Sequence, residues 1–139
     1  MAMKSVAVYR RFSDLDPLGH VNNVIYLDYL QEARVGLIED VSLVFGRGYS
    51  QIVVDHSLRY VKPLGYAREP LRIDLWVSRL GRSSYDIDYV IHDENAVVAA
   101  TAVTKLAVID AESGRPIRIP QEVLDQLGDY VVERGADNA

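Results

Sequence analysis

The spacing of apolar residues changes along the chain and predicts one long helix with strand-like segments on both sides. Between Tyr26 and Val41 apolar residues recur every three or four positions, which is the period of an amphipathic helix of roughly four to five turns. Asn22 or Asn23 can cap its start, because an asparagine side chain accepts hydrogen bonds from the free N–H groups of a first turn. The helix is expected to end before Gly46.

Strand-like runs account for most of the remaining chain. One precedes the helix at 4–13, and four follow it, rich in β-branched residues or alternating between apolar and polar. These four runs are 52–60, 71–78, 85–92 and 97–109. Tight connections between them favour antiparallel pairing, because parallel neighbours need a long crossover. A short helix is expected at 121–127, and the chain from about residue 135 is expected to be a frayed tail.

A long helix with an apolar stripe must bury that stripe, and the strands provide the only large partner. The sequence therefore predicts an α+β fold in which a curved antiparallel β-sheet wraps around one long central helix. Alternate residues such as Trp76 and Val90 would leave apolar surface on the outer face of this sheet. We expect the protein to self-associate for that reason.

Length and composition narrow the class of protein. The 139 residues suit a single domain, 1–139, and 49% hydrophobic with 25% charged residues is the balance of a soluble globular protein. A formal net charge of −5 without a basic block argues against nucleic-acid binding. No apolar run approaches the ~20 residues of a membrane span, and no signal peptide is recognisable, so a cytoplasmic location without membrane attachment is expected.

The candidate chemistry lies at 14–34, where two carboxylates on a loop containing glycine and proline stand just before the long helix. The start of a helix presents free N–H groups and a partial positive charge, which would polarise a carbonyl and stabilise an oxyanion. A nearby carboxylate could attack that carbonyl or deprotonate a water molecule. Spacing alone favours the simpler alternative, in which Asp14 and Asp16 only cap the loop and the helix.

Other catalytic arrangements find little support in the sequence. Zero cysteines exclude thiolate nucleophiles and Cys-ligated zinc, and no G-x-S-x-G motif marks a serine nucleophile. The histidines His20, His56 and His92 lack the close spacing of metal ligands, so no metal site is expected. His56 and His92 are interpreted as structural or surface residues.

Residues 14–26 read D-L-D-P-L-G-H-V-N-N-V-I-Y, which resembles the signature D-x-D-x-x-G-H-x-N-N-x-x-Y of hotdog-fold thioesterases of the 4-hydroxybenzoyl-CoA thioesterase type. Weaker similarity continues through 60–63, 80–85 and 110–120, so the resemblance covers nearly the whole chain. It implies the hotdog fold and hydrolysis of an acyl-thioester, with acyl-CoA preferred, to a carboxylic acid and a free thiol. It also implies a homodimer or homotetramer with active sites between subunits.

The resemblance assigns expected roles to individual residues. Asp16 matches the catalytic carboxylate, acting as nucleophile or general base, and the backbone N–H of Asn23 matches the donor that polarises the carbonyl. His20 matches a position that orients the thioester or water, and Tyr26 matches the tyrosine near the acyl group. Asp14 matches the first acid of the signature, for which a structural role is expected.

Further residues are expected to bind the substrate. The candidates for lining the acyl group are Tyr26, Tyr29 and Tyr49, each of which could equally be a packing residue. The phosphates of coenzyme A call for cationic and N–H donors. The candidates are Arg59, Lys62, Arg82, Ser83 and Ser84. Each of these residues could instead be a solvated group at the rim of the sheet. Among them the turn 82–84 is the favoured phosphate-binding candidate, because it matches a loop on the nucleotide side of the site in the family. The family often has Gly-Asp in the turn after the 52–60 segment, whereas this chain has Gly-Tyr-Ala-Arg at 65–68.

Two other functions stay open at this stage. One is a carrier-protein-specific thioesterase of a fatty acid or polyketide pathway, and the other is a non-catalytic acyl-binding hotdog module. The presence of Asp16 and of the 19–23 run weighs against the non-catalytic module. No cofactor is expected beyond coenzyme A as part of the substrate or product. The sequence does not determine acyl length or a preference for aromatic over aliphatic groups.

Overall fold

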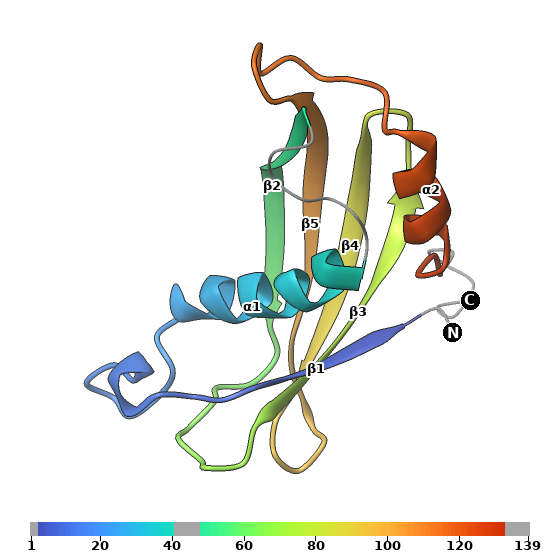
Figure 1. The fold of residues 1–139 in the computed structure, drawn as a ribbon. Helices are drawn as coiled ribbons and strands as arrows, with labels where there is room; N and C mark the ends of the chain where they lie inside the picture. The colour runs from blue at the N-terminus through green and yellow to red at the C-terminus, as the bar shows by residue number, and fades with distance from the viewer. Residues whose placement is uncertain (1–2, 41–47, 133–139) are drawn as a thin grey trace.

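The computed structural model describes residues 3–40 and 48–132, which form a curved five-stranded sheet with one long helix lying across a face of it (Figure 1). The elements in chain order are β1 (Lys4–Val8), a 3-10 turn η1 (Phe12–Asp14), α1 (Ile25–Asp40), β2 (Tyr49–Tyr60), β3 (Leu71–Leu80), β4 (Ser84–His92), β5 (Val98–Asp110) and α2 (Gln121–Gly128). The predicted α+β architecture is confirmed.

The strand order β1-β3-β4-β5-β2 places the two strands that flank α1 at opposite edges of the sheet. Every neighbouring pair is antiparallel. Tight connections join β3 to β4 and β4 to β5, as predicted, but β2 and β3 are successive strands that do not pair, because β2 lies at the edge beside β5. The chain therefore leaves one edge at the end of β1, crosses the sheet as α1 and re-enters at the other edge as β2 (Figure 1). This crossing positions the loop before α1, which holds the candidate site.

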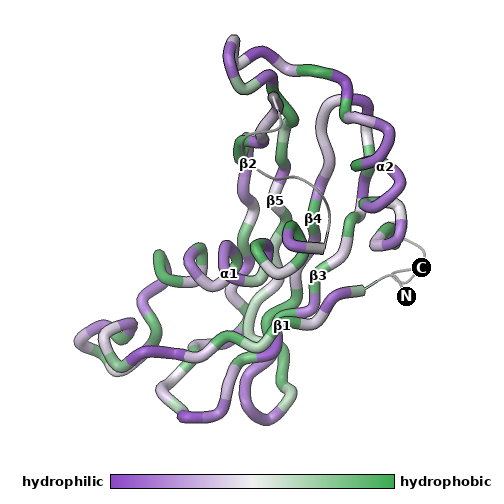
Figure 2. Tube along the Cα trace, viewed as in Figure 1, coloured by the Kyte–Doolittle hydropathy of each residue, from purple (hydrophilic) through white to green (hydrophobic). Residues whose placement is uncertain are grey.

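The core lies between α1, α2 and the inner face of the sheet. Leu75, Tyr89 and Ala102 stand in register across β3, β4 and β5, and all three are buried. Hydrophobic and hydrophilic residues alternate along both helices (Figure 2), and α1 contributes apolar side chains to the same core. A Cβ at Gly36 would come within 3.1 Å of Val6 Cγ2, so the glycine lets α1 approach β1 closely.

Most predicted elements agree with the structure to within a few residues. The expected strand 4–13 is too long, because β3 begins at Leu71, the partner of Val8, and offers later residues nothing to pair with. Of the two possible capping residues, Asn22 accepts a hydrogen bond from the Val24 N–H at 3.0 Å. The last apolar residue of the expected helical pattern, Val41, the loop near Gly46 and the tail from about 135 lie outside the described residues.

The outer face of the sheet is more polar than the sequence predicted. Trp76 and Val90 are half-buried there, and ion pairs such as Arg79–Asp86, 3.0 Å apart, lie on the same face. More exposed apolar side chains lie on the edge strand β2, where Val54 is 53% exposed. Edge strands carry unpaired N–H and C=O groups, so β2 offers a better surface for self-association than the outer face.

Candidate active site

The loop before α1 is closed by its own backbone hydrogen bonds. The Asp16 N–H donates to the His20 carbonyl at 2.8 Å, and the Gly19 N–H donates to the Asp16 carbonyl at 3.0 Å. Gly19 has φ +82°, a left-handed conformation that glycine adopts without strain. Gly19 therefore allows the tight turn that brings His20 next to Asp16.

The Asp16 carboxylate is held by one oxygen only. Its Oδ1 accepts hydrogen bonds from the N–H groups of Leu18 at 2.9 Å and His20 at 3.2 Å. Its Oδ2 has no hydrogen-bond partner within residues 3–40 and 48–132, and the side chain is half-buried. The loop thus fixes the orientation of the carboxylate and leaves one oxygen available for chemistry.

The start of α1 supplies a free donor beside this carboxylate. The chain turns at 22–25, where the Ile25 N–H donates to the Asn22 carbonyl at 2.9 Å. No described group accepts a hydrogen bond from the Asn23 N–H, and the Tyr60 hydroxyl donates to the Asn23 carbonyl at 2.7 Å. Tyr60, on the edge strand, therefore ties the start of the helix to the sheet.

These groups line one surface hollow of about 360 Å³. Its residues are Asp16, His20, Val21, Asn23, Tyr26, Tyr60, Val61, Lys62 and Pro63. The rings of Tyr26 and Tyr60 pack edge to face with centroids 4.9 Å apart. Burial raises the pKa of Tyr26, which is therefore a neutral packing and lining residue. The hollow thus combines a carboxylate, an imidazole, a free N–H and aromatic walls.

Asp14 is buried on the other side of the loop and cannot take part in chemistry there. It is 2% exposed, and the Tyr29 hydroxyl donates to its Oδ2 at 2.6 Å. Burial raises the pKa of Asp14, but hydrogen bonds from Tyr29 and Arg11 outweigh this and hold the pKa below its usual value. Arg11 also forms an ion pair with Asp14 at 3.0 Å. Asp14 therefore joins the loop to α1, in line with its expected structural role.

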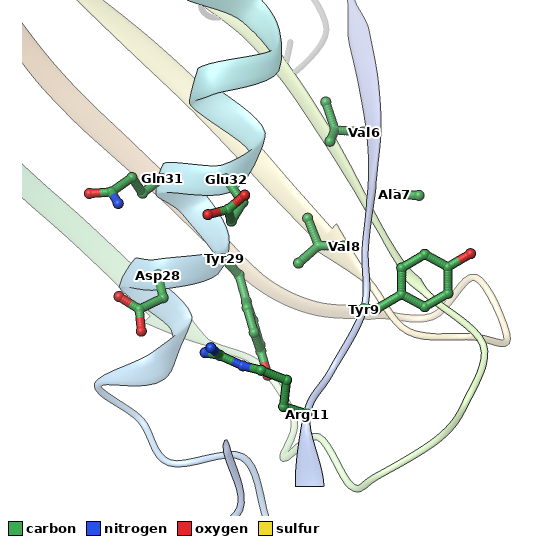
Figure 3. A pocket seen from close by; sticks show the side chains of 9 residues that line it. All are labelled: Val6, Ala7, Val8, Tyr9, Arg11, Asp28, Tyr29, Gln31 and Glu32. Atoms are coloured by element: carbon green, nitrogen blue, oxygen red, sulfur yellow. The ribbon is translucent and has the colours of Figure 1, made fainter. Parts of the chain in front are cut away.

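Tyr29 points away from the candidate site. Its ring lies between α1 and β1 and approaches Arg11, beside a second hollow of about 440 Å³ (Figure 3). Its hydroxyl is already bonded to Asp14. Of the three tyrosines expected to line the acyl group, only Tyr26 lines the active-site hollow within one chain. Tyr49 lies at the far end of β2, where its hydroxyl contacts Glu122 Oε1 at 3.5 Å.

The expected phosphate-binding residues are spread over the molecule. Arg59 lines a separate hollow with Trp76 on the outer face. Arg82 lies beside α2, in a third hollow that it shares with Arg118. Ser83 lies in the β3–β4 connection and Ser84 begins β4, where its Oγ accepts a hydrogen bond from Arg79. Lys62 does line the active-site hollow. A single chain therefore brings Lys62, but not the others, next to Asp16.

The ammonium group of Lys62 is paired with Asp93, a buried residue at the start of the β4–β5 turn. Asp93 Oδ1 also accepts hydrogen bonds from the N–H groups of Asn95 and Val97, each at 2.9 Å. The hydrogen bonds from Lys62 and from the turn lower the pKa of Asp93 from 3.8 to about 2. Much of the positive charge of Lys62 is thus neutralised within the protein.

This pair predicts a dependence of stability on pH. Because the folded pKa of Asp93 is lower than the unfolded one, its contribution to stability is fully present above 3.8 and is lost as the pH falls toward about 2. Replacing Asp93 by asparagine should lower the melting temperature at pH 7. Between pH 4 and 2 the melting temperature of this variant should decrease less than that of the wild-type protein. Thermal unfolding followed by circular dichroism measures both effects. The matched control Asp129→Asn, at an exposed carboxylate, should keep the wild-type slope.

Tyr60 is the functional candidate that the sequence analysis missed. It stands in the 60–63 segment, which the resemblance covers, but nothing in the sequence connects it to Asn23. The only signal was its position at the end of a strand, just before Pro63. Its role in the site depends on a contact across 37 positions of the chain.

The curved sheet around α1 defines a hotdog-fold protein, and a carboxylate and a backbone N–H without a described partner share one hollow at the start of that helix. The chain belongs to the thioesterase-like superfamily, whose sequence profile matches residues 10–127. This confirms the resemblance carried by the motif at 14–26. Within the described residues, no helix is long and apolar enough to cross a membrane.

Individual relatives are similar over most of their length. A Bacillus subtilis protein named "Putative acyl-CoA thioesterase YneP" is 26% identical over 78% of this chain and 80% of its own. The structure of "a predicted thioesterase from Bacillus stearothermophilus" is 25% identical, with a TM-score of 0.87 over 96% of this chain and all of its own. A Thermus thermophilus thioesterase, solved with coenzyme A and Zn, is 28% identical, with a TM-score of 0.77 over 91% of this chain and 93% of its own.

Proposed function

We propose that the protein hydrolyses acyl-CoA thioesters to a carboxylic acid and free coenzyme A. The proposal depends on one observation: an Asp16 carboxylate oxygen and the Asn23 N–H, neither with a partner among the described residues, lie in the same hollow. Thioesters suit so sparse a site, because their carbonyl gains little resonance from sulfur and a thiolate leaves without a strong general acid. The coenzyme A bound to the Thermus relative supports this class of donor.

In the proposed reaction the thioester carbonyl oxygen accepts a hydrogen bond from the Asn23 N–H. This donor and the positive end of α1 stabilise the negative charge that develops on the oxygen. Asp16 Oδ2 then follows one of two routes. It attacks the carbonyl carbon, expelling the thiolate and leaving an anhydride that water hydrolyses, or it takes a proton from a water molecule that attacks instead. The exposed His20 imidazole lies beside this position and orients the water or the thioester.

A panel of acyl-CoA substrates with release of free thiol as the readout tests the proposal. We expect turnover of at least one acyl-CoA, and the panel should include aromatic and aliphatic groups of several lengths. Turnover of acyl carrier protein thioesters without turnover of any acyl-CoA would instead identify a carrier-protein-specific thioesterase. Binding of acyl-CoA without release of thiol would identify an acyl-binding module.

We further propose that the site is completed in a homodimer formed along β2. This edge strand carries an exposed apolar run, with Ile52 47%, Val53 41% and Val54 53% exposed. Antiparallel pairing of two β2 strands would set the Tyr49 end of one copy beside the Tyr60 end of the other. Tyr49 and Arg82 lie far from Asp16 of their own chain. In this dimer they would lie at the same end as the active-site hollow of the other copy.

A lysine in the middle of the free edge tests this interface. Val54→Lys would place two like charges near the symmetry axis, and lysine opposes the pairing of edge strands. We expect the variant to be a folded monomer by size-exclusion chromatography with light scattering, with thioesterase activity at least tenfold lower. Val97→Lys, at an apolar residue of similar exposure (47%) in the β4–β5 turn, should remain a dimer of full activity. A wild-type protein that is monomeric and active would contradict the proposed interface.

A further inference from the structure

Arg34, on α1, is a buried cation without a carboxylate partner in the described part of the chain. Its residue exposure is 7%, and its Nη1 donates to the Tyr89 hydroxyl at 3.1 Å, which is its one hydrogen bond among the described residues. An arginine side chain stays charged in proteins and presents five N–H donors. A buried charge is costly unless it is paired, so this guanidinium calls for an anion.

The polar groups around Arg34 do not supply that anion. The nearby Thr104 hydroxyl is bonded to His56 at 2.9 Å, and the Tyr85 hydroxyl is bonded to Gln51. Burial and the charge of Arg34 lower the pKa of His56, whose imidazole is therefore neutral at pH 7. The Tyr89 hydroxyl accepts from Arg34, and no described group accepts its proton. Two donors, a guanidinium and a phenol, therefore meet beside a neutral polar wall.

Carboxylates of α1 lie on another side of the helix. Asp28 and Glu32 border the hollow between α1 and β1 (Figure 3). At 100° per residue, Leu27 and Ile38 lie within about 40° of Arg34 around the helix, whereas Asp28 and Glu32 lie about 120° and 160° away. The residues of β2 on the inner face, including His56 and Tyr60, are not acidic. A second copy that presents the same flank and strand would therefore bring no carboxylate to Arg34.

The position of Arg34 relates it to the proposed site. Its Cα lies ~16 Å beyond that of Asn23 along the helix, at a rise of ~1.5 Å per residue, and helical side chains slant back toward the N-terminus. On the inner face of β2, the residues from Tyr60, in the active-site hollow, to His56, beside Arg34, are exposed or half-buried. An acyl group whose carbonyl rests at Asn23 can lie along this strip with its distal end at Arg34.

We propose that Arg34 and Tyr89 form a carboxylate-binding site for the distal end of the acyl group. The substrates would then be CoA monothioesters of dicarboxylic acids. Of the ~16 Å between the two Cα atoms, an arginine side chain that slants back toward the N-terminus covers ~6 Å, so ~10 Å remain, which is roughly the length of eight carbons in an extended chain. This inference rests on the proposed thioesterase function and names its substrate class. The guanidinium would hold the carboxylate through charge-assisted hydrogen bonds, and the Tyr89 hydroxyl would donate a further one.

The test compares suberyl-CoA with octanoyl-CoA, which have the same number of carbons and differ in the distal carboxylate. The wild-type protein is expected to favour suberyl-CoA at least tenfold in kcat/KM, the order of effect of one charge-assisted hydrogen bond. Arg34→Met should abolish or invert this ratio, and Arg34→Lys, which keeps the charge, should retain part of it. Tyr89→Phe should reduce it several-fold. Circular dichroism and light scattering establish that each variant is a folded dimer.

The possible outcomes separate this inference from the proposed function. Hydrolysis of octanoyl-CoA with no preference for suberyl-CoA would overturn the carboxylate site and leave the thioesterase proposal standing. Dissociation of Arg34→Met into monomers with an unchanged substrate ratio would show that Arg34 serves the subunit interface, and the inference would be wrong. If no thioester is hydrolysed, the thioesterase proposal fails. Calorimetric titration with free suberate and octanoate then tests the carboxylate site alone. The inference requires that the wild-type protein bind suberate more tightly than octanoate and that Arg34→Met remove this difference.

Discussion

Asp16→Asn should lower kcat for thioester hydrolysis by about 10³-fold while leaving the fold intact. Asparagine keeps an oxygen that accepts from the Leu18 and His20 N–H groups, so the loop should retain its shape. It lacks the negative charge needed to attack a carbonyl or take a proton from water. Thiol release from an acyl-CoA measures the loss, and Asp129→Asn, at an exposed carboxylate, is the matched control. A folded Asp16→Asn variant with wild-type activity would refute the mechanism.

The same residue allows the two proposed routes to be distinguished. In a single turnover in ¹⁸O-labelled water, attack by Asp16 followed by hydrolysis of the anhydride at the aspartyl carbonyl leaves ¹⁸O in the side chain. A general base leaves Asp16 unlabelled and places all of the ¹⁸O in the released acid. Hydrolysis of the anhydride at its acyl carbonyl would do the same, so ¹⁸O in Asp16 is the result that identifies a nucleophile. Mass spectrometry of the peptide that contains 14–20 reads the result directly.

Asn23→Pro should reduce kcat by about 10²- to 10³-fold, the usual effect of removing one oxyanion donor. Proline deletes the backbone N–H that is proposed to polarise the carbonyl. The backbone should accommodate it, because Asn23 is the second residue of the turn at 22–25, where proline is favoured. The Asn23 carbonyl remains available to the Tyr60 hydroxyl.

Asn23→Ala is the control for this experiment, because it removes the side chain and keeps the N–H. It should retain activity within a few-fold of the wild-type protein, with an unchanged melting temperature. Equal losses in the two variants would assign the effect to the side chain and remove the backbone donor from the mechanism. Unimpaired turnover by a folded Asn23→Pro variant would have the same consequence.

The sequence predicted the site where the contributing residues are close together in the chain. Asp16, His20, Asn23 and Tyr26 all lie within 14–26, so a local motif is enough to bring them together. The secondary structure was predictable for a similar reason. The apolar period differs between helix and strand, and it changes sharply at both ends of α1.

Residues that depend on pairing between distant segments could not be predicted. The contact of Tyr60 with Asn23 and the pairing of Lys62 with Asp93 both follow from the register of β2, β5 and β4. Tyr29 shows a second limit. It lies about 60° around the helix from Tyr26, which turns it toward β1 and Asp14. Nothing in the sequence indicates which flank of α1 faces the active-site hollow.

The burial of Asp14 has a consequence for the stiffness of the catalytic loop. Its side chain is bonded to Tyr29 in α1, and its carbonyl accepts the Asn22 N–H at 2.9 Å, so Asp14 attaches the start of the loop both to α1 and to the turn that precedes this helix. The proposed catalytic carboxylate and oxyanion donor are thereby parts of one rigid unit. Their spacing is set when the protein folds, so substrate binding does not have to supply free energy to organise them.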